Sequence, residues 1–151
     1  MLGAAKVVLV ETDADALDVL RQNVNGLGPA LAQRAVVKQA TLGIDEVTTE
    51  GVDVVMMNPP WGVQKAKADR PFLETAFSSE ASAIHLLHSD RAAHVVAMAS
   101  DHGWHAEAVL RTEFRLPATY AHHAQRRGST DVMCWRFYRP GDAKLPTDED
   151  L

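Results

Sequence analysis

An apolar run that stops at an amide and two prolines is the feature that most constrains the fold of this chain. Residues 52–57 (Val-Asp-Val-Val-Met-Met) precede Asn58-Pro59-Pro60, and their composition is typical of a buried parallel strand. Both prolines hold φ at about −65° and cannot extend a sheet ladder, which predicts a stiff turn at the strand end. Ligands of open α/β sheets bind at the carboxyl ends of the strands, so we expect Asn58 at the active edge.

Strand-like and helix-like segments alternate along the rest of the chain. We expect strands at 6–11, 35–39, 83–88, 107–116 and 131–138. We expect helices from Asp13 to the Asn25–Pro29 stretch, from Pro71 onward, and through His102 after a cap at Ser89-Asp90. This order predicts a doubly wound α/β sheet with a terminal antiparallel hairpin. We expect one domain over residues 1–139 and a flexible acidic tail over 140–151.

Composition narrows the class of protein. The 151 residues are 46% apolar, which suffices for a core, and their net charge of −5 argues against a general nucleic-acid coat. A single cysteine, and no leader or membrane-length apolar run, favour a soluble cytoplasmic protein. The seven histidines follow no recognised metal spacing, so we expect no metal site. Basic side chains instead gather in two predicted loops, where RNA contacts are expected: Lys65, Lys67, Arg70, His122, His123, Arg126 and Arg127.

The turn after the central strand has the functional groups to hold a planar amine. The Asn58 amide oxygen and the carbonyl of Pro59 are acceptors, and an exocyclic amine offers two N–H donors to them. Trp61 adds a flat face on which an extruded base could stack, a contact worth about 1–3 kcal/mol. The alternative is that Asn58 to Trp61 is only a strand-ending turn, because asparagine and proline both favour turns.

Several ordered segments resemble the methyltransferase-like protein 5 family, including its archaeal members. Asn58-Pro59-Pro60-Trp61 is similar to the motif of Asn-Pro-Pro-aromatic methyltransferases, with tryptophan where family members usually have phenylalanine. The remaining segments that carry the resemblance are Gly3–Val8, Asp13–Leu17, Ala68–Leu73 (Ala-Asp-Arg-Pro-Phe-Leu) and Leu116-Pro117 with the basic loop after it. The resemblance covers Leu2 to about Tyr138.

The resemblance implies a fold, an activity and a set of site residues. The fold would be a Rossmann-like class I methyltransferase sheet, and the reaction would be S-adenosylmethionine-dependent N6-methylation of an adenosine in small-subunit ribosomal RNA. Asn58, Pro59, Pro60 and Trp61 would be catalytic, while Glu11, Thr12 and Asn58 would bind the methyl donor. Glu11 also closes a predicted strand, in the position from which an acid typically binds a ribose, although a solvated strand-end carboxylate is the alternative. A small zinc-ribbon activator subunit is the implied partner.

Two departures from the family pattern bear on the methyl donor. The family's first strand and its glycine-rich donor loop have no counterpart here, so we expect a sheet that lacks its central first strand. Ala40 stands where an acid is expected to hold the donor's adenine. Two alternatives therefore stay open: a non-catalytic remnant that binds RNA or a protein partner, and a methyltransferase for a guanine N2 or a glutamine side chain.

Overall fold

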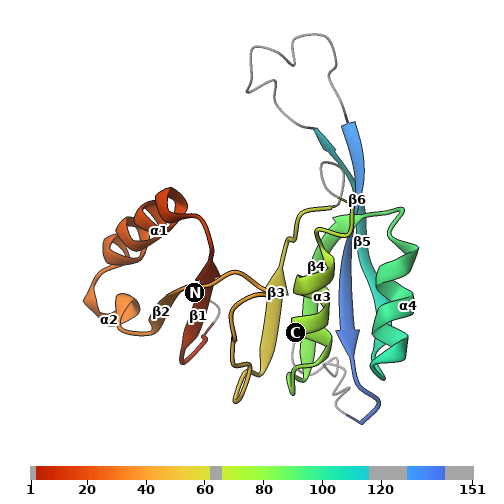
Figure 1. The fold of residues 1–151 in the computed structure, drawn as a ribbon, viewed down its shortest axis with the longest axis horizontal. Coiled ribbons are helices and arrows are strands. Elements are labelled where there is room, and N and C mark those ends of the chain that lie inside the picture. Colours follow the sequence, from red (N-terminus) through yellow and green to blue (C-terminus); the bar gives the residue numbers. More distant parts are fainter. Residues whose placement is uncertain (1–2, 62–65, 116–128, 142–151) are drawn as a thin grey trace, which may run out of the picture. The chain divides into compact units, whose positions relative to one another are not determined.

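A computed structural model describes residues 3–61, 66–115 and 129–141 of the chain (Figure 1). The chain divides into two compact units, Met1–Thr48 and Thr49–Leu151, and each is described here by itself. Among the described residues, no helix has both the length and the apolar character needed to cross a membrane. The predicted tail falls largely within 142–151, outside the described residues.

The first unit is a strand–helix–helix–strand arrangement. Strand β1 (Val7–Glu11) and strand β2 (Ala35–Gln39) pair in parallel, with Val7 opposite Ala35. Helix α1 (Ala14–Gly26) joins them and is followed by the short helix α2 (Pro29–Ala32), which the sequence analysis did not predict. Asp13 caps α1, because its side chain accepts a 2.8 Å hydrogen bond from the Ala16 backbone N–H.

Burial in the first unit is sparse. Of its described residues, 3–48, Leu17 alone is fully buried, on the inner face of α1. The side chains of Val8 and Val10 on β1 are more than a third exposed. Hydrophobic burial is the main favourable term in folding, so this unit has little of its own to hold it together.

The second unit contains a four-stranded mixed sheet with the order β3-β4-β6-β5. Its elements in chain order are β3 (Val54–Met57), α3 (Arg70–Phe77), β4 (Ala83–Ser89), α4 (Ala93–Asp101), β5 (His105–Arg115) and β6 (Ser129–Tyr138). Strands β3 and β4 are parallel, whereas β6 runs antiparallel to both β4 and β5. The predicted mixed α/β architecture with a terminal antiparallel pair is thereby confirmed.

The core of the second unit lies where α3 and α4 pack on the sheet. Phe77 from α3 meets Phe137 from β6 edge to face, with ring centroids 5.1 Å apart. Trp104, just before β5, is buried beside them and donates a 2.9 Å hydrogen bond from Nε1 to the Phe77 carbonyl. This core fixes the positions of the strand ends at which the candidate site lies.

Two predicted details differ from the structure. The strand before Asn58 is expected to be buried, but only one of its faces is. Val55 and Met57 pack against the core, whereas the alternating side chains of Val54 and Met56 are 48% and 74% exposed. The helix expected from residue 90 begins at Ala93 and has no side-chain cap. Ser89 is instead the last residue of β4, and its hydroxyl accepts a hydrogen bond from the Arg91 backbone.

Candidate active site

The turn of Asn58, Pro59, Pro60 and Trp61 lies at the carboxyl edge of the second unit's sheet. It directly follows β3, and the parallel pairing of Met57 with Leu86 brings the end of β4 to the same edge. Pro59 is buried, whereas Asn58 is exposed to solvent. The chain therefore anchors the turn through a proline and leaves the amide side chain accessible.

Trp61 contacts both Asn58 and the end of β4. Its indole Nε1 donates a 3.2 Å hydrogen bond to Asn58 Oδ1. The indole also stacks on the His88 imidazole, with ring centroids 5.9 Å apart and planes inclined by 29°. An acceptor amide and a flat aromatic ring are thus neighbours at one strand end, and this combination can hold a planar base that carries an amine.

Next to Trp61 lies a cluster of one carboxylate and two imidazoles. Asp69 Oδ2 is 3.1 Å from Nε2 of His88 and 2.6 Å from Nε2 of His94. Asp69 and His88 are buried, while the His94 side chain is 56% exposed. The three ligand atoms lie within 4.8 Å of one another, the spacing of a group that could also hold a metal ion.

Burial and mutual contacts shift the pKa values in this cluster. Burial lowers the pKa of His88 below 6.5, although the bond and charge of Asp69 act in the opposite direction. Burial would raise the pKa of Asp69, but hydrogen bonds and charge from His94 and then His88 outweigh it and lower that pKa below 3.8. At neutral pH the cluster therefore holds an ionised Asp69 and a neutral His88.

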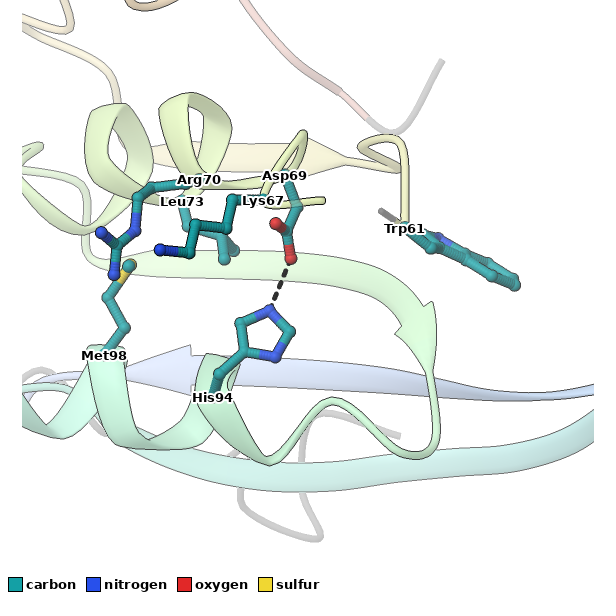
Figure 2. Close-up of a pocket in the computed structure, with 7 residues that line it drawn as sticks. All are labelled: Trp61, Lys67, Asp69, Arg70, Leu73, His94 and Met98. Atoms are coloured by element: carbon teal, nitrogen blue, oxygen red, sulfur yellow. Dashed lines mark hydrogen bonds and ion pairs between the residues drawn. The ribbon is translucent and has the colours of Figure 1, made fainter. Parts of the chain in front are cut away.

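A hollow of about 290 Å³ opens beside the cluster (Figure 2). Figure 2 shows His94, from the first turn of α4, directed toward Asp69 at its wall. Two cations, Lys67 and Arg70, line the same hollow, and Lys67 has the positive φ of 61° that is uncommon outside glycine. The residues that line it are Trp61, Lys67, Asp69, Arg70, Leu73, His94 and Met98.

The structure brings together only some of the predicted site residues. Asn58, Trp61, Lys67 and Arg70 all belong to the second unit, and the last three line one hollow. Other predicted RNA contacts lie outside the described residues: Lys65, His122, His123, Arg126 and Arg127.

The predicted donor-binding residues belong to the first unit. The Glu11 Oε1 atom accepts hydrogen bonds from the backbone N–H groups of Thr12 (2.7 Å) and Asp13 (2.9 Å). The Thr12 hydroxyl contacts the Thr41 hydroxyl. Ala40 offers no side-chain acceptor, and its backbone N–H donates to the Glu11 carbonyl. These residues fit a ribose better than an adenine, so the fit to S-adenosylmethionine is partial.

The functional potential of Asp69, His88 and His94 is not predicted from the sequence. Asp69 lies in a segment that carries the family resemblance and His88 at the end of a predicted strand, but no sequence pattern connects them. One signal was available: His88 lies at the carboxyl end of the strand that follows the one before Asn58, and parallel neighbours end at the same edge.

Comparison with known proteins gives a consistent set of relatives. The model of a family described as Conserved hypothetical protein 95 matches residues 2–104. The rRNA N(6)-adenosine-methyltransferase METTL5 of Danio rerio is 32% identical over 139 residues, which make up 91% of this chain and 66% of that protein. The chain thus spans just under two thirds of the length of that curated relative.

Solved structures give the same result for the fold. One similar crystal structure is that of PH1948 from Pyrococcus horikoshii, a candidate RNA methyltransferase. The two sequences are 28% identical, the TM-score is 0.72, and the match covers 91% of this chain and 65% of that chain. Thermoplasma acidophilum 1320 is 19% identical with a TM-score of 0.65, covers 93% of this chain and 70% of that chain, and bears on the fold alone. The Rossmann-like methyltransferase fold expected from the sequence is thereby confirmed.

Proposed function

Because the chain belongs to the family described as Conserved hypothetical protein 95, and METTL5 is among its relatives, we propose that it takes part in N6-methylation of an adenosine in small-subunit ribosomal RNA. The single observation that supports this most is the pairing of Asn58 with Trp61 at the carboxyl edge of the sheet. An amide acceptor beside an aromatic face suits a flipped-out adenine, because the base carries both a π-face and an exocyclic amine.

In the proposed reaction the turn binds and polarises the target amine. Asn58 Oδ1 and the Pro59 carbonyl accept its two N–H groups, which draws the nitrogen lone pair out of the ring and directs it toward the incoming methyl group. Trp61 holds the base by stacking, and Pro60 keeps the turn stiff. S-adenosylmethionine, when bound, would supply the methyl group: its S–C bond would break as the new N–C bond forms, S-adenosylhomocysteine would leave, and the methylated nitrogen would lose one proton to water.

We assign the RNA backbone to the basic side chains around the hollow. Lys67 and Arg70 lie on its wall beside Trp61, which supports a phosphate-binding role next to the captured base. Lys65, His122, His123, Arg126 and Arg127 are proposed to extend this surface, on the strength of their sequence clustering. Local positive charge is needed because the chain as a whole carries a net charge of −5.

S-adenosylmethionine is the proposed methyl donor, and Glu11, Thr12 and Asn58 are its proposed contacts in this chain. One Glu11 oxygen already binds two backbone N–H groups, which holds the carboxylate at the end of β1 where a ribose would meet it. Ala40 has no side-chain acceptor for the adenine of the donor, so we expect weak binding of the donor by this chain alone.

A zinc-ribbon activator subunit is the proposed partner, and the cytoplasm is the proposed location. The partner is proposed from the resemblance, and open strand edges support it, since β2 and β3 each pair with one strand only among the described residues. Unpaired strand edges commonly receive a strand from another protein. Co-purification of the chain with such a subunit, and its loss when the β2 edge is blocked by proline, would test the assignment.

The decisive test is methyl transfer by the chain extended at its N-terminus with a glycine-rich donor loop. We expect N6-methyladenosine in digested small-subunit ribosomal RNA after incubation with S-adenosylmethionine. The Asn58→Ala variant should lose about a hundredfold in kcat, because one preorganised electrostatic contact is removed, while RNA affinity stays nearly unchanged. Mass spectrometry of the nucleosides and filter binding of the RNA provide the two measurements.

Other outcomes would lead to other functions. Near-normal turnover in Asn58→Ala would show that the turn is only a strand terminator. RNA binding without methyl transfer by the extended protein would favour a non-catalytic RNA-binding role. Methyl groups on guanine N2 or on a glutamine side chain would keep the chemistry of the turn and change its substrate.

A further inference from the structure

Asp69, His88 and His94 come from three different elements and meet at one oxygen atom. Asp69 precedes α3, His88 lies in β4 and His94 lies in α4, yet Asp69 Oδ2 contacts both imidazoles, at 3.1 and 2.6 Å. A buried carboxylate needs such partners, because an unpaired charge in this position would be costly. The bond from His94 therefore holds the Asp69 carboxylate, and the bond between Asp69 and His88 orients the His88 ring.

The oriented His88 ring contacts Trp61, and Trp61 in turn contacts Asn58. The His88 ring stacks on the indole of Trp61, and the indole N–H donates to Asn58 Oδ1 at 3.2 Å. An indole N–H is a donor only, so it selects the rotamer of Asn58 that turns the oxygen, and not the amide nitrogen, toward it. A carbonyl oxygen has two lone pairs, which leaves one for a second donor.

We propose that Asp69, His88 and His94 are positioning residues for the Asn58 acceptor, acting through the stacked Trp61. Asp69 fixes the His88 ring, His88 supports the indole, and the indole N–H aims the amide oxygen. The inference rests on the proposed function, since a correctly turned Asn58 is useful only if a target amine binds there. It also gives the tryptophan a role that a phenylalanine at this position could not fill.

A hydrogen-bonded cluster accounts for the geometry better than a metal site does. The separation of 3.1 Å is that of an N–H group that donates to a carboxylate, and the separation of 2.6 Å is a shorter contact of the same kind. Ligands around a tetrahedral zinc ion would stand about 3.3 Å apart with their lone pairs turned inward. Lys67 and Arg70 line the adjoining hollow, and their charges would oppose a divalent cation.

NMR spectroscopy of the chain tests the proposal without reference to activity. The three tryptophans give three indole N–H signals, and Trp61→Phe identifies the one from residue 61. Asp69→Asn, which removes the charge at nearly constant shape, should lower the heteronuclear NOE of the Trp61 indole. His94→Gln, a milder change at an exposed position, should lower it less. Asp101→Asn, the same change as at Asp69 but at the exposed end of α4, should leave it unchanged.

The same spectra show whether the variants are folded. The indole of Trp104 is buried and bonded to the Phe77 carbonyl, so its unchanged signal reports an intact core. An equally ordered Trp61 indole in folded Asp69→Asn would overturn the proposal. A Trp61 that becomes ordered only on addition of Zn²⁺, and loses that order with a chelator, would also overturn it, in favour of a metal site.

Activity of the extended protein separates this inference from the proposed function. Trp61→Phe keeps a stacking face but loses the N–H, so kcat should fall while KM for RNA stays the same. Equal kcat in Trp61→Phe and the parent would overturn the role of the indole N–H. Absence of methyl transfer in the parent would contradict the proposed function, and the NMR comparison of Asp69→Asn with Asp101→Asn would still decide the positioning role.

Discussion

Asp69 and His88 respond to pH in a way that can be worked out from their contacts. Burial lowers the pKa of His88, so below about pH 6.5 the unfolded chain gains a proton that the folded chain resists. The lowered pKa of Asp69, which follows when the contacts of His94 and His88 outweigh burial, adds stability above about pH 3.8. That contribution is lost as the pH falls through the folded-state pKa. Both groups therefore make acid destabilising.

We predict that the urea midpoint of unfolding is lower at pH 5 than at pH 7.5. His88→Gln, which can still donate to Asp69 but does not titrate, should reduce the difference between the two midpoints. The other six histidines are present in both proteins, so the comparison reports the exchange at residue 88. Equal pH dependence in the variant and the parent would mean that His88 is readily protonated in the folded state.

The two cations of the hollow should contribute to RNA affinity through phosphate contacts. The logarithm of the RNA association constant falls linearly with the logarithm of the salt concentration. We predict that Lys67→Ala and Arg70→Ala each make this negative slope shallower by about one. Arg21→Ala serves as a control, since Arg21 lies on α1 in a surface ion pair with Asp18. Fluorescence anisotropy with a labelled RNA gives the slopes, and an unchanged slope in both variants would locate the RNA elsewhere.

At the scale of single residues, the sequence predicts contacts between residues that are close along the chain. It does not predict contacts that form only when separate elements pack together. Asn58 and Trp61 can be paired from the sequence because three positions separate them and two prolines fix the turn. The contact of Asp69 with His88 and His94 depends on how α3, β4 and α4 pack, and no local pattern encodes that packing. The hydrogen bond from the Trp61 indole likewise needs a rotamer that the sequence does not specify.

At the scale of elements, α3 is held to the sheet by one aromatic side chain above all. Phe77 is 1% exposed and meets Phe137 edge to face. We predict that Phe77→Ala lowers the free energy of unfolding by about 3–5 kcal/mol, the usual cost of emptying such a site. Val109→Ala on β5, where the side chain is 58% exposed, should change it by less than about 0.5 kcal/mol. Urea titration followed by circular dichroism measures both.

A small loss in Phe77→Ala would mean that α3 is not held by its apolar face. The periodic apolar residues of that helix and its proline near the first turn were enough to predict it from the sequence. The start of α4 was not predicted correctly, because Ser89 and Asp90 look like a cap while β4 in fact continues through Ser89. The same residues can end a strand or cap a helix, and the pairing of that strand with its neighbours decides which of the two they do.

At the scale of the whole molecule, the two units differ greatly in what they bury. Leu17 is the only fully buried residue described in the first unit, whereas the second has a contiguous aromatic and aliphatic core. We predict that amide hydrogens of residues 3–48 exchange well before those of β4 and β6. Hydrogen exchange followed by mass spectrometry measures this, and uniform protection across the chain would contradict it.

The fold class could be predicted from the sequence because strands and helices alternate and the last two strands form a hairpin. The exposure of β3 and the weak burial of the first unit could not be predicted in this way. An apolar strand pattern does not show whether another element will cover the strand. Val54 and Met56 have the composition of a buried strand and yet face solvent here.

The sparse burial of residues 3–48 also bears on how much of this protein a cell would maintain. Proteases cut segments that open readily, and the population of the open form follows the local free energy of opening. A substitution such as Leu17→Ala removes the one fully buried side chain described there and should sharply shorten the lifetime of the chain. The abundance of the protein, and not only its chemistry, would then depend on a single leucine far in sequence from Asn58.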